Sequence, residues 1–396
     1  MTKSRFRTAL LALVLALWSA TGLQAIDTLP SQISDDEFWK LSESASEPGG
    51  SFQSENFLSN ETGFQMVLPV LTRIVKPGGV YMGVGPEQNF TYIAAIHPKI
   101  AFIVDIRRQN MLEHLIYKAL FEMSDNRADF LSKLFSRKRP SGLNDKSTPD
   151  DMFIAYRTAP TDNDAFKKNL QDIKDLLVKK HKFGLTNEDQ INIEHVYTVF
   201  HDDGPEINYN SGTLNGRGRG GMPNYIDVMT ATDPQGQQRS YLATEENYRF
   251  LRELEGRNML IPLTGDFGGK KAIRAVGQYL KDHGATVSAF YLSNVENYLF
   301  QNQGGPGNPN GGVASFYANV ATLPLDSSST FIRSRSGGGG GGFGGSSRPP
   351  NELASILETL DAFKDGRIRG YQDIFNVPVF RGDVPDPSSP RNPGPR

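Results

Sequence analysis

The fold of this chain is decided by the stretch Gly78–Asn110, which reads GGVYMGVGPEQNFTYIAAIHPKIAFIVDIRRQN. The pattern predicts a strand at Val80–Val84, a helix from about Glu87 and a second strand at Ile100–Asp105. Two apolar strands joined by a helix are typical of a parallel sheet that is covered by helices on both faces. The stretch therefore predicts an α/β fold.

Strand-like and helix-like segments continue to alternate outside this unit. Together they predict a doubly wound, mostly parallel, Rossmann-like sheet of about six or seven strands. The further helices are expected at Phe64–Ile74, before Met123, and at Glu245–Leu254 and Lys270–His283. The further strands are expected at Tyr225–Met229, Asn258–Leu263, Thr286–Leu292, Ala314–Leu323 and Thr330–Arg333.

Composition divides the chain into a folded part and several flanking segments. A polar lead-in, extended or short-helical, is expected over residues 26–55, so that the compact part starts near Asn56. The Rossmann-like domain is expected over residues 56–335, with a helical insertion at 124–223 where charged segments interrupt the alternation. The remaining segments are a Gly-rich flexible loop (336–350), a C-terminal helical segment (351–380) and a disordered Pro-rich tail (381–396).

The N-terminus has the order of parts that is typical of an export signal. Three cations within residues 3–7 precede an apolar run over residues 9–18, and small residues follow as far as Ala25. The run is about ten residues long, whereas a permanent transmembrane helix needs about 20. We therefore expect cleavage near Ala25 and export of a bacterial protein to the periplasm or the medium, without membrane insertion afterwards.

Charge and composition disfavour several classes of function. The formal net charge is −2 and becomes −5 when the cations of residues 1–25 leave, which disfavours nucleic acid as a partner. The chain has no cysteine, which excludes disulfides, thiolate nucleophiles and cysteine-ligated metals. His195 and His201 are six residues apart, a poor spacing for one helix face, so no metal site is expected. No Gly-x-Ser-x-Gly pentapeptide occurs, which disfavours a serine hydrolase.

Three residues in the deciding stretch indicate a ligand. Gly83 and Gly85 stand between the first strand and the helix, where free backbone N–H groups and the helix dipole favour a polar ligand. Asp105 ends the second strand, 22 residues after Gly83, where a carboxylate can accept the hydroxyls of a ribose. This pattern resembles the first two motifs of the class I S-adenosylmethionine-dependent methyltransferases.

Later segments are similar in outline to the same family. Ile261–Phe267 resembles its fourth strand running into an active-site loop, and Tyr291–Val295 resembles its fifth-strand end. The resemblance implies S-adenosylmethionine as the cofactor of a divergent, exported member. The residues that it implies are Gly83, Gly85, Glu87 and Asp105 for the cofactor, and Asp266 and Asn294 facing the substrate.

The sequence also departs from the family. The family usually has an acid and a third glycine at the places of Tyr81 and Glu87.

Three of the implied residues have a structural alternative. Asp105 can pair with Arg107 or Arg108, or it can cap the helix that starts near Gln109. Helix capping is also the alternative role of Asp266 and Asn294.

Export also conflicts with catalysis. S-adenosylmethionine is made in the cytosol and is charged, so an exported enzyme would lack its methyl donor. Two functions therefore stay open: a methyltransferase-like enzyme that binds an adenosine-type ligand, and a non-catalytic exported binding or scaffold protein that reuses the fold.

Overall fold

The computed structural model describes residues 27–212, 222–301, 312–335 and 351–377. The expected export signal (1–25), Gly-rich loop (336–350) and Pro-rich tail (381–396) lie outside the described residues. Among the described helices, none has the length and apolar character required to cross a membrane.

A six-stranded sheet with the order β3-β2-β1-β4-β5-β6 forms the centre of the molecule. All neighbouring strands are parallel except β5 and β6, which are antiparallel. Nearly every residue of β1 to β4 is buried, which explains why these strands are almost uniformly apolar. The predicted α/β class and mostly parallel sheet are confirmed. The strands are β1 (Val80–Gly83), β2 (Ile100–Asp105), β3 (Leu260–Thr264), β4 (Val287–Ser293), β5 (Thr330–Ser334) and β6 (Asn351–Ser355).

The strand register places the ends of the parallel strands along one edge. Gly83 pairs with Ile103, and Asp105 pairs with Thr264. Because β6 runs in the opposite direction, its first residue, Asn351, lies at this same edge. We call this side the carboxyl edge of the sheet. The strand order reverses between β1 and β4, which places the middle of this edge at the crossover point.

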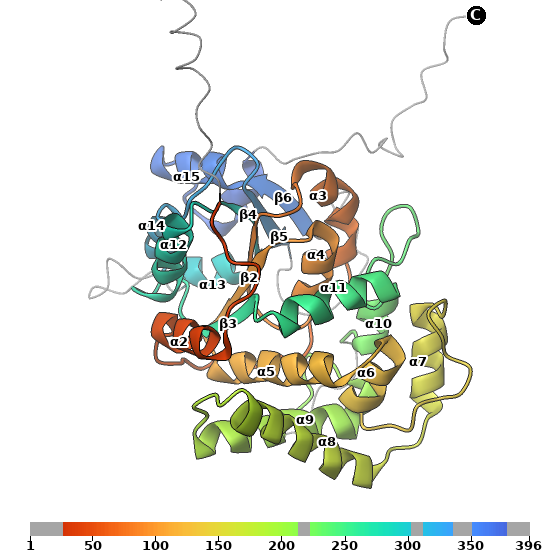
Figure 1. Ribbon diagram of the computed structural model, residues 1–396. Coiled ribbons are helices and arrows are strands. Elements are labelled where there is room, and N and C mark those ends of the chain that lie inside the picture. The colour runs from red at the N-terminus through yellow and green to blue at the C-terminus, as the bar shows by residue number, and fades with distance from the viewer. Residues whose placement is uncertain (1–26, 213–221, 302–311, 336–350, 378–396) are drawn as a thin grey trace, which may run out of the picture.

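Helices cover the sheet on two sides, as Figure 1 shows, with α12 and α14 on one side and α4 and α11 on the other. The helix α5 packs against β2 and β3 and also against α11 and α9. The helices are α2 (Asp35–Ala45), η1 (Phe64–Val67), α3 (Leu68–Ile74), α4 (Gln88–Ile96), α5 (Arg108–Met123), α6 (Arg127–Leu134), α7 (Pro149–Thr158), α8 (Asn163–Asp175), η2 (Leu176–Lys180), α9 (Asn187–Asp203), η3 (Gly204–Glu206), α10 (Tyr225–Thr230), α11 (Glu245–Gly256), α12 (Ala272–Asp282), α13 (Val295–Gln301), α14 (Val313–Val320), α15 (Ile356–Lys364) and η4 (Tyr371–Asn376).

The inserted segment is helical, as predicted. The helices α6, α7, α8 and α9 follow one another in it, and they lie beside and below α5 in Figure 1. Asn126, Thr148, Asp162 and Thr186 cap their N-termini with side-chain oxygens, which explains the sharp helix starts in this polar region.

The packed part begins well before Asn56, contrary to the sequence-based expectation. The helix α2 starts with a capping box between Ser34 and Glu37, and its Phe38 is fully buried in the main core. Ser42 Oγ donates a 2.6 Å hydrogen bond to the carbonyl oxygen of Pro262 in β3. Since β3 is an edge strand, it tolerates this proline, and α2 covers the edge.

The strand predicted at Tyr225–Met229 is wrong, because this segment is the helix α10. Asn224 Oδ1 accepts a 3.0 Å hydrogen bond from Asp227 N, and Asp227 Oδ2 accepts one of 3.0 Å from Asn224 N. This capping box is a helix-start signal, and it outweighs the short apolar run that suggested a strand.

Two further assignments differ near the C-terminus. The strand predicted at Ala314–Leu323 is the helix α14, in which Phe316 and Val320, four residues apart, are buried on one face. The strand β6 lies within the segment 351–380 that was expected to be helical, whereas α15 agrees with that expectation. The polar sequence of β6 adopts the extended form because it pairs with β5.

Candidate functional site

A segment from the N-terminal part of the chain crosses the carboxyl edge of the sheet. We call residues 46–61 the N-terminal strap. Its first half is fixed through backbone hydrogen bonds: Glu47 N donates to Thr264 O at 2.8 Å, and Gly50 N donates to Ile106 O at 2.7 Å. The strap therefore passes the end of β3 and then the end of β2.

The second half of the strap is held by side chains. Ser59 N donates to the carboxyl group of Glu87, just beyond β1, at 3.2 and 3.3 Å. The Glu61 carboxyl group accepts hydrogen bonds from Ser293 Oγ at the end of β4, at 2.5 Å, and from Asn351 Nδ2 at the start of β6, at 2.9 Å. The strap thus covers the part of the sheet where open α/β proteins bind their ligands.

The Gly83–Gly85 turn is shaped by Asn89. A Cβ atom on Gly83 would lie 2.0 Å from Asn89 Oδ1, and Gly85 has a φ of +78°, so both positions require glycine. Asn89 Nδ2 donates to the carbonyl oxygens of residues 84, 85 and 86 at 2.9, 3.1 and 2.7 Å. Tyr81, at the place where an acid was expected, donates from its hydroxyl to Asn89 Oδ1 at 2.8 Å. The contact with Asn89 therefore explains why residue 83 is a glycine, and no ligand is needed to explain it.

Glu87 lies directly after this turn and is completely buried. Burial raises the pKa of its carboxyl group to about 8, and the nearby Glu61 carboxyl group adds to the effect. Glu87 is therefore mostly protonated at neutral pH. A neutral acid in this position can donate a hydrogen bond as well as accept one.

Asp105 is held by Arg107. Asp105 Oδ1 accepts hydrogen bonds from Arg107 N at 2.9 Å and from Arg107 Nε at 3.3 Å. This is the local ion pair that the structural alternative requires. No described residue donates to Asp105 Oδ2, and the buried Arg107 Nη2 has no described partner. Both roles of Asp105, as a ligand residue and as a structural anchor, are thus compatible with the geometry.

The first half of α5 adds buried polar groups that sequence reasoning missed. Glu113 is fully buried, and both of its carboxyl oxygens lack a described partner. Burial raises its pKa well above the ordinary value, and the Glu87 carboxyl group adds to this. The helical spacing around Glu113 gave no signal, because it is the spacing of a core helix.

His114 ties α5 to the glycine turn. Its Nε2 donates to Gly85 O at 2.9 Å, and burial lowers its pKa to about 4, so the ring is neutral and Nδ1 is an acceptor. Three further buried atoms of this region lack a described partner: Nδ1 of His114, Oε1 of Gln88 and Nδ2 of Asn110. Unpaired buried polar atoms are costly, so each of them calls for a water or a ligand.

The two residues expected to face a substrate also lie at the carboxyl edge. Asp266 is exposed after β3, and its Oδ1 accepts a 2.8 Å hydrogen bond from Gly268 N. Because α12 begins only at Ala272, this contact stabilises a turn and is no helix cap. Asn294 is half-buried and directly follows β4. The structure therefore brings all six predicted site residues to one edge, although it spreads them over the ends of four strands.

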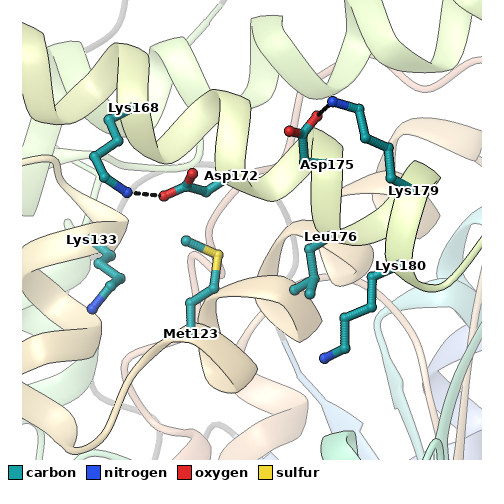
Figure 2. A pocket seen from close by; sticks show the side chains of 8 residues that line it. All are labelled: Met123, Lys133, Lys168, Asp172, Asp175, Leu176, Lys179 and Lys180. Atoms are coloured by element: carbon teal, nitrogen blue, oxygen red, sulfur yellow. Dashed lines mark hydrogen bonds and ion pairs between the residues drawn. The ribbon is translucent and has the colours of Figure 1, made fainter.

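A concave region away from the carboxyl edge lies between α5 and α6 on one side and α8 and η2 on the other. Figure 2 shows Met123 among four lysine side chains, and the cavity has a volume of about 660 Å³. Each ammonium group has a carboxylate partner. This lysine cleft is therefore a solvated network of ion pairs, and it carries no surplus charge for an anionic ligand. Its lining residues are Met123, Lys133, Lys168, Asp172, Asp175, Leu176, Lys179 and Lys180.

No cluster of three or more metal-ligating side chains occurs among the described residues. His195 and His201 both lie on α9, which continues to Asp203. His201 Nδ1 lies 2.8 Å from the carboxylate of the adjacent Asp202.

Comparison with known proteins gives a family without an assigned activity. A family model described as a domain of unknown function (DUF7790) matches residues 56–144 and 150–363. The match covers the glycine turn and also the carboxyl ends of the strands β4 and β5. No curated protein matches the chain.

Proposed function

We propose that this chain, which belongs to the DUF7790 family, is an exported protein that binds an adenosine-type ligand at the carboxyl edge of β1 and β2. S-adenosylmethionine is the first candidate ligand. In this proposal the ribose hydroxyls bind Asp105, and the ligand lies along the Gly83–Glu87 turn.

One observation carries this proposal: among the buried polar atoms that lack a described hydrogen-bond partner, those of five residues lie beside the glycine turn and the end of β2. They belong to Gln88 in the turn, to Arg107 after β2, and to Asn110, Glu113 and His114 on α5. A cluster of perturbed and unsatisfied groups in one place is typical of a functional site, whereas a structural core satisfies its polar groups.

The sheet topology supports the same location. The strand order β3-β2-β1-β4-β5-β6 and the helices on both faces support a doubly wound, Rossmann-like arrangement, from which the antiparallel β6 departs. Doubly wound sheets bind nucleotides at the crossover point, outside the carboxyl ends of the strands. Here that point lies between β1 and β4.

A thermal-shift titration tests the proposal. S-adenosylmethionine or S-adenosylhomocysteine at 100 times its dissociation constant should stabilise the folded protein by about 2.7 kcal/mol. Asp105→Asn should keep most of the stability but weaken binding by about 1.5–3 kcal/mol, the scale of hydrogen bonds to charged groups. Asp282→Asn, at the exposed end of α12, is the matched control and should bind normally.

A non-catalytic binding or scaffold protein is the second candidate, and the N-terminal strap favours it. The strap covers the carboxyl edge, so that Gly83, Gly85 and Glu87 are all buried without a ligand. If neither adenosine compound shifts the melting temperature of well-folded protein, the adenosine proposal is wrong and the scaffold function is preferred.

Export is tested separately. The intact mass of the protein from its native host should correspond to a chain that begins at Ile26. A chain that begins at Met1 or Thr2 would contradict export, and it would also remove the compartment objection to methyl transfer.

A further inference from the structure

Ser293 has an unusual backbone conformation at the end of β4. Its φ is +49°, in the left-handed region that residues other than glycine rarely adopt. The pairing of β4 with β5 shifts between Tyr291 and Ser293, and α13 begins two residues later at Val295. Ser293 thus lies on a sharp strand-to-helix turn at the carboxyl edge. Backbone strain of this kind is common at functional sites, and nucleophilic serines of α/β enzymes occupy such turns.

The hydroxyl of Ser293 has a carboxyl partner. Ser293 Oγ donates to Glu61 Oε1 at 2.5 Å, and Asn351 Nδ2 donates to the other oxygen, Glu61 Oε2, at 2.9 Å. A nucleophile, a base and a group that orients the base therefore follow one another in a chain of hydrogen bonds. This is the arrangement that activates a weak nucleophile.

The three hydrogen-bonded residues differ in solvent exposure. Catalysis requires a buried base and a nucleophile that a substrate can reach. Glu61 is only 7% exposed, whereas Ser293 is half-buried. Burial raises the pKa of Glu61, which makes its carboxylate a stronger base than a free glutamate.

The neighbouring Asn294 supplies a donor for the charge that develops on the substrate. Its Oδ1 lies 3.5 Å from Ser293 Oγ, which places the side-chain amide beside the nucleophile. No described residue accepts a hydrogen bond from Asn294 Nδ2. An asparagine amide in this position can stabilise an oxyanion.

We propose that Ser293 is the nucleophile of an esterase site, with Glu61 as the general base, Asn351 as a positioning residue and Asn294 as the oxyanion donor. The substrate class is a carboxylic ester. The proposal does not depend on the adenosine-type ligand, because it uses the ends of β4 and β6, whereas that ligand uses β1 and β2.

The reaction proceeds in two balanced steps. Ser293 Oγ bonds to the carbonyl carbon of the ester while Glu61 takes its proton; the bond to the leaving alcohol then breaks, and Glu61 returns the proton to the alcohol. In the second step Glu61 takes a proton from water, the hydroxide attacks the acyl group, and the acid leaves as Ser293 Oγ recovers a proton.

The absence of a Gly-x-Ser-x-Gly pentapeptide disfavoured a serine hydrolase in the sequence. The structure places a serine on the same kind of turn without those glycines. A purely structural role, in which Ser293 only fastens the strap, accounts for the hydrogen bond to Glu61. It leaves the positive φ and the half-buried position of Ser293 unexplained.

A fluorophosphonate probe tests the nucleophile on the full-length protein. Peptide mass spectrometry should find the adduct on Ser293, and p-nitrophenyl acetate should be hydrolysed. Ser293→Ala should abolish both, and Glu61→Gln should lower the hydrolysis rate by about 100-fold or more. Ser136→Ala is the matched control, because Ser136 also has a positive φ, +46°, but bonds Tyr197 instead of a carboxyl group. It should keep full labelling of Ser293.

A cysteine variant tests whether a reagent can reach the side chain at position 293, independently of any activity. Since the chain has no cysteine, Ser293→Cys introduces its only thiol. Iodoacetamide should alkylate it in the folded protein, whereas Ser136→Cys, at a fully buried position, should resist. Folded wild-type protein without an adduct on Ser293, hydrolysis that survives Ser293→Ala, or a Ser293→Cys thiol that resists alkylation would each overturn the proposal.

Discussion

The carboxyl edge of the sheet and the lysine cleft both contain several ionisable side chains, but these side chains differ in burial and in pairing. In the lysine cleft each cation is paired with a carboxylate and none is buried; Lys168 and its partner Asp172 are 73% and 40% exposed. At the carboxyl edge Glu87 and Glu113 are fully buried, and Glu113 has no described partner at all. Buried carboxyl groups, which are costly to ionise, are therefore found at the edge where the sheet topology predicts a ligand, whereas the lysine cleft keeps its charges paired and accessible to solvent.

The largest expected effect is on the free energy of unfolding, when a buried ion pair near this edge loses one partner. Arg333 on β5 pairs with Glu296 on α13 at 2.6 Å, and both side chains are at most 2% exposed. Arg333→Met leaves Glu296 buried without a counter-charge, and we expect a loss of about 3–5 kcal/mol in urea unfolding. The double variant with Glu296→Leu should recover most of it. A single variant that unfolds like the wild type would mean that water reaches this pair.

The next effect is the contribution of Glu87 to the pH dependence of stability. Its pKa rises from the ordinary 4.5 to about 8 on folding, so between these values the folded state holds a proton that the unfolded state has lost. Stability should therefore fall as pH rises, by up to about 1.4 kcal/mol for each pH unit. Glu87→Gln should make this slope shallower in urea unfolding between about pH 5 and 7.5, because Glu61 and Glu113 still contribute to it. Parallel curves for variant and wild type would show that Glu87 is ionised in the folded protein.

A smaller effect is expected at the buried residue His181, which follows η2 of the lysine cleft. His181 lies 2.9 Å from an oxygen of Asp35 on α2 and 3.0 Å from one of Glu122 on α5. Burial opposes its charge, but these two carboxylates outweigh burial and raise its pKa. This stabilisation is present below pH 6.5 and is lost as pH rises through the raised pKa.

His181→Gln should therefore destabilise the protein at pH 5.5 by about 1 kcal/mol, a figure reduced for solvent screening. Near pH 9 the difference from the wild type should be much smaller, which paired thermal melts at the two pH values would show. An equal loss at both values would assign the effect to packing against Phe183, whose ring stacks on His181.

The smallest effect is expected in the lysine cleft. Lys168 and Asp172 form an exposed pair one helical turn apart, and such pairs contribute about 0.3–0.5 kcal/mol. Lys168→Ala should change the free energy of unfolding by no more than this, and high salt should remove the difference. A larger loss would contradict the comparison between the two regions.

The sequence predicts the first half of the fold better than the second. The strands β1 and β2 and the helices α4 and α5 are local, apolar and periodic, so their pattern reveals them. The strand β6 is polar and extended only because β5 lies beside it, which no local pattern encodes. For α10 a readable capping signal at Asn224 was outweighed by a short apolar run.

The residues of the candidate site also fall into two groups, those that the sequence predicts and those that it does not. Gly83, Gly85 and Asp105 were predicted from a local motif, and they do lie together at the carboxyl edge. Glu61 and Glu113 could not be predicted, because their importance comes from what surrounds them in space. Glu61 contacts residues 232 and 290 positions away in the chain, and Glu113 is distinguished only by burial without a partner.

The long sequence separation between Glu61 and its partners also affects the order in which parts of the molecule can fold. The strap belongs to the first sixth of the chain, yet Glu61 bonds to Asn351 on the last strand. A ribosome that has made the strap must still synthesise almost 300 residues before that strand exists. Closing so large a loop is slow, so the carboxyl edge is expected to form among the last parts of the molecule. Until then the acidic side chains that end up buried there remain hydrated, and the newly made chain stays accessible to chaperones.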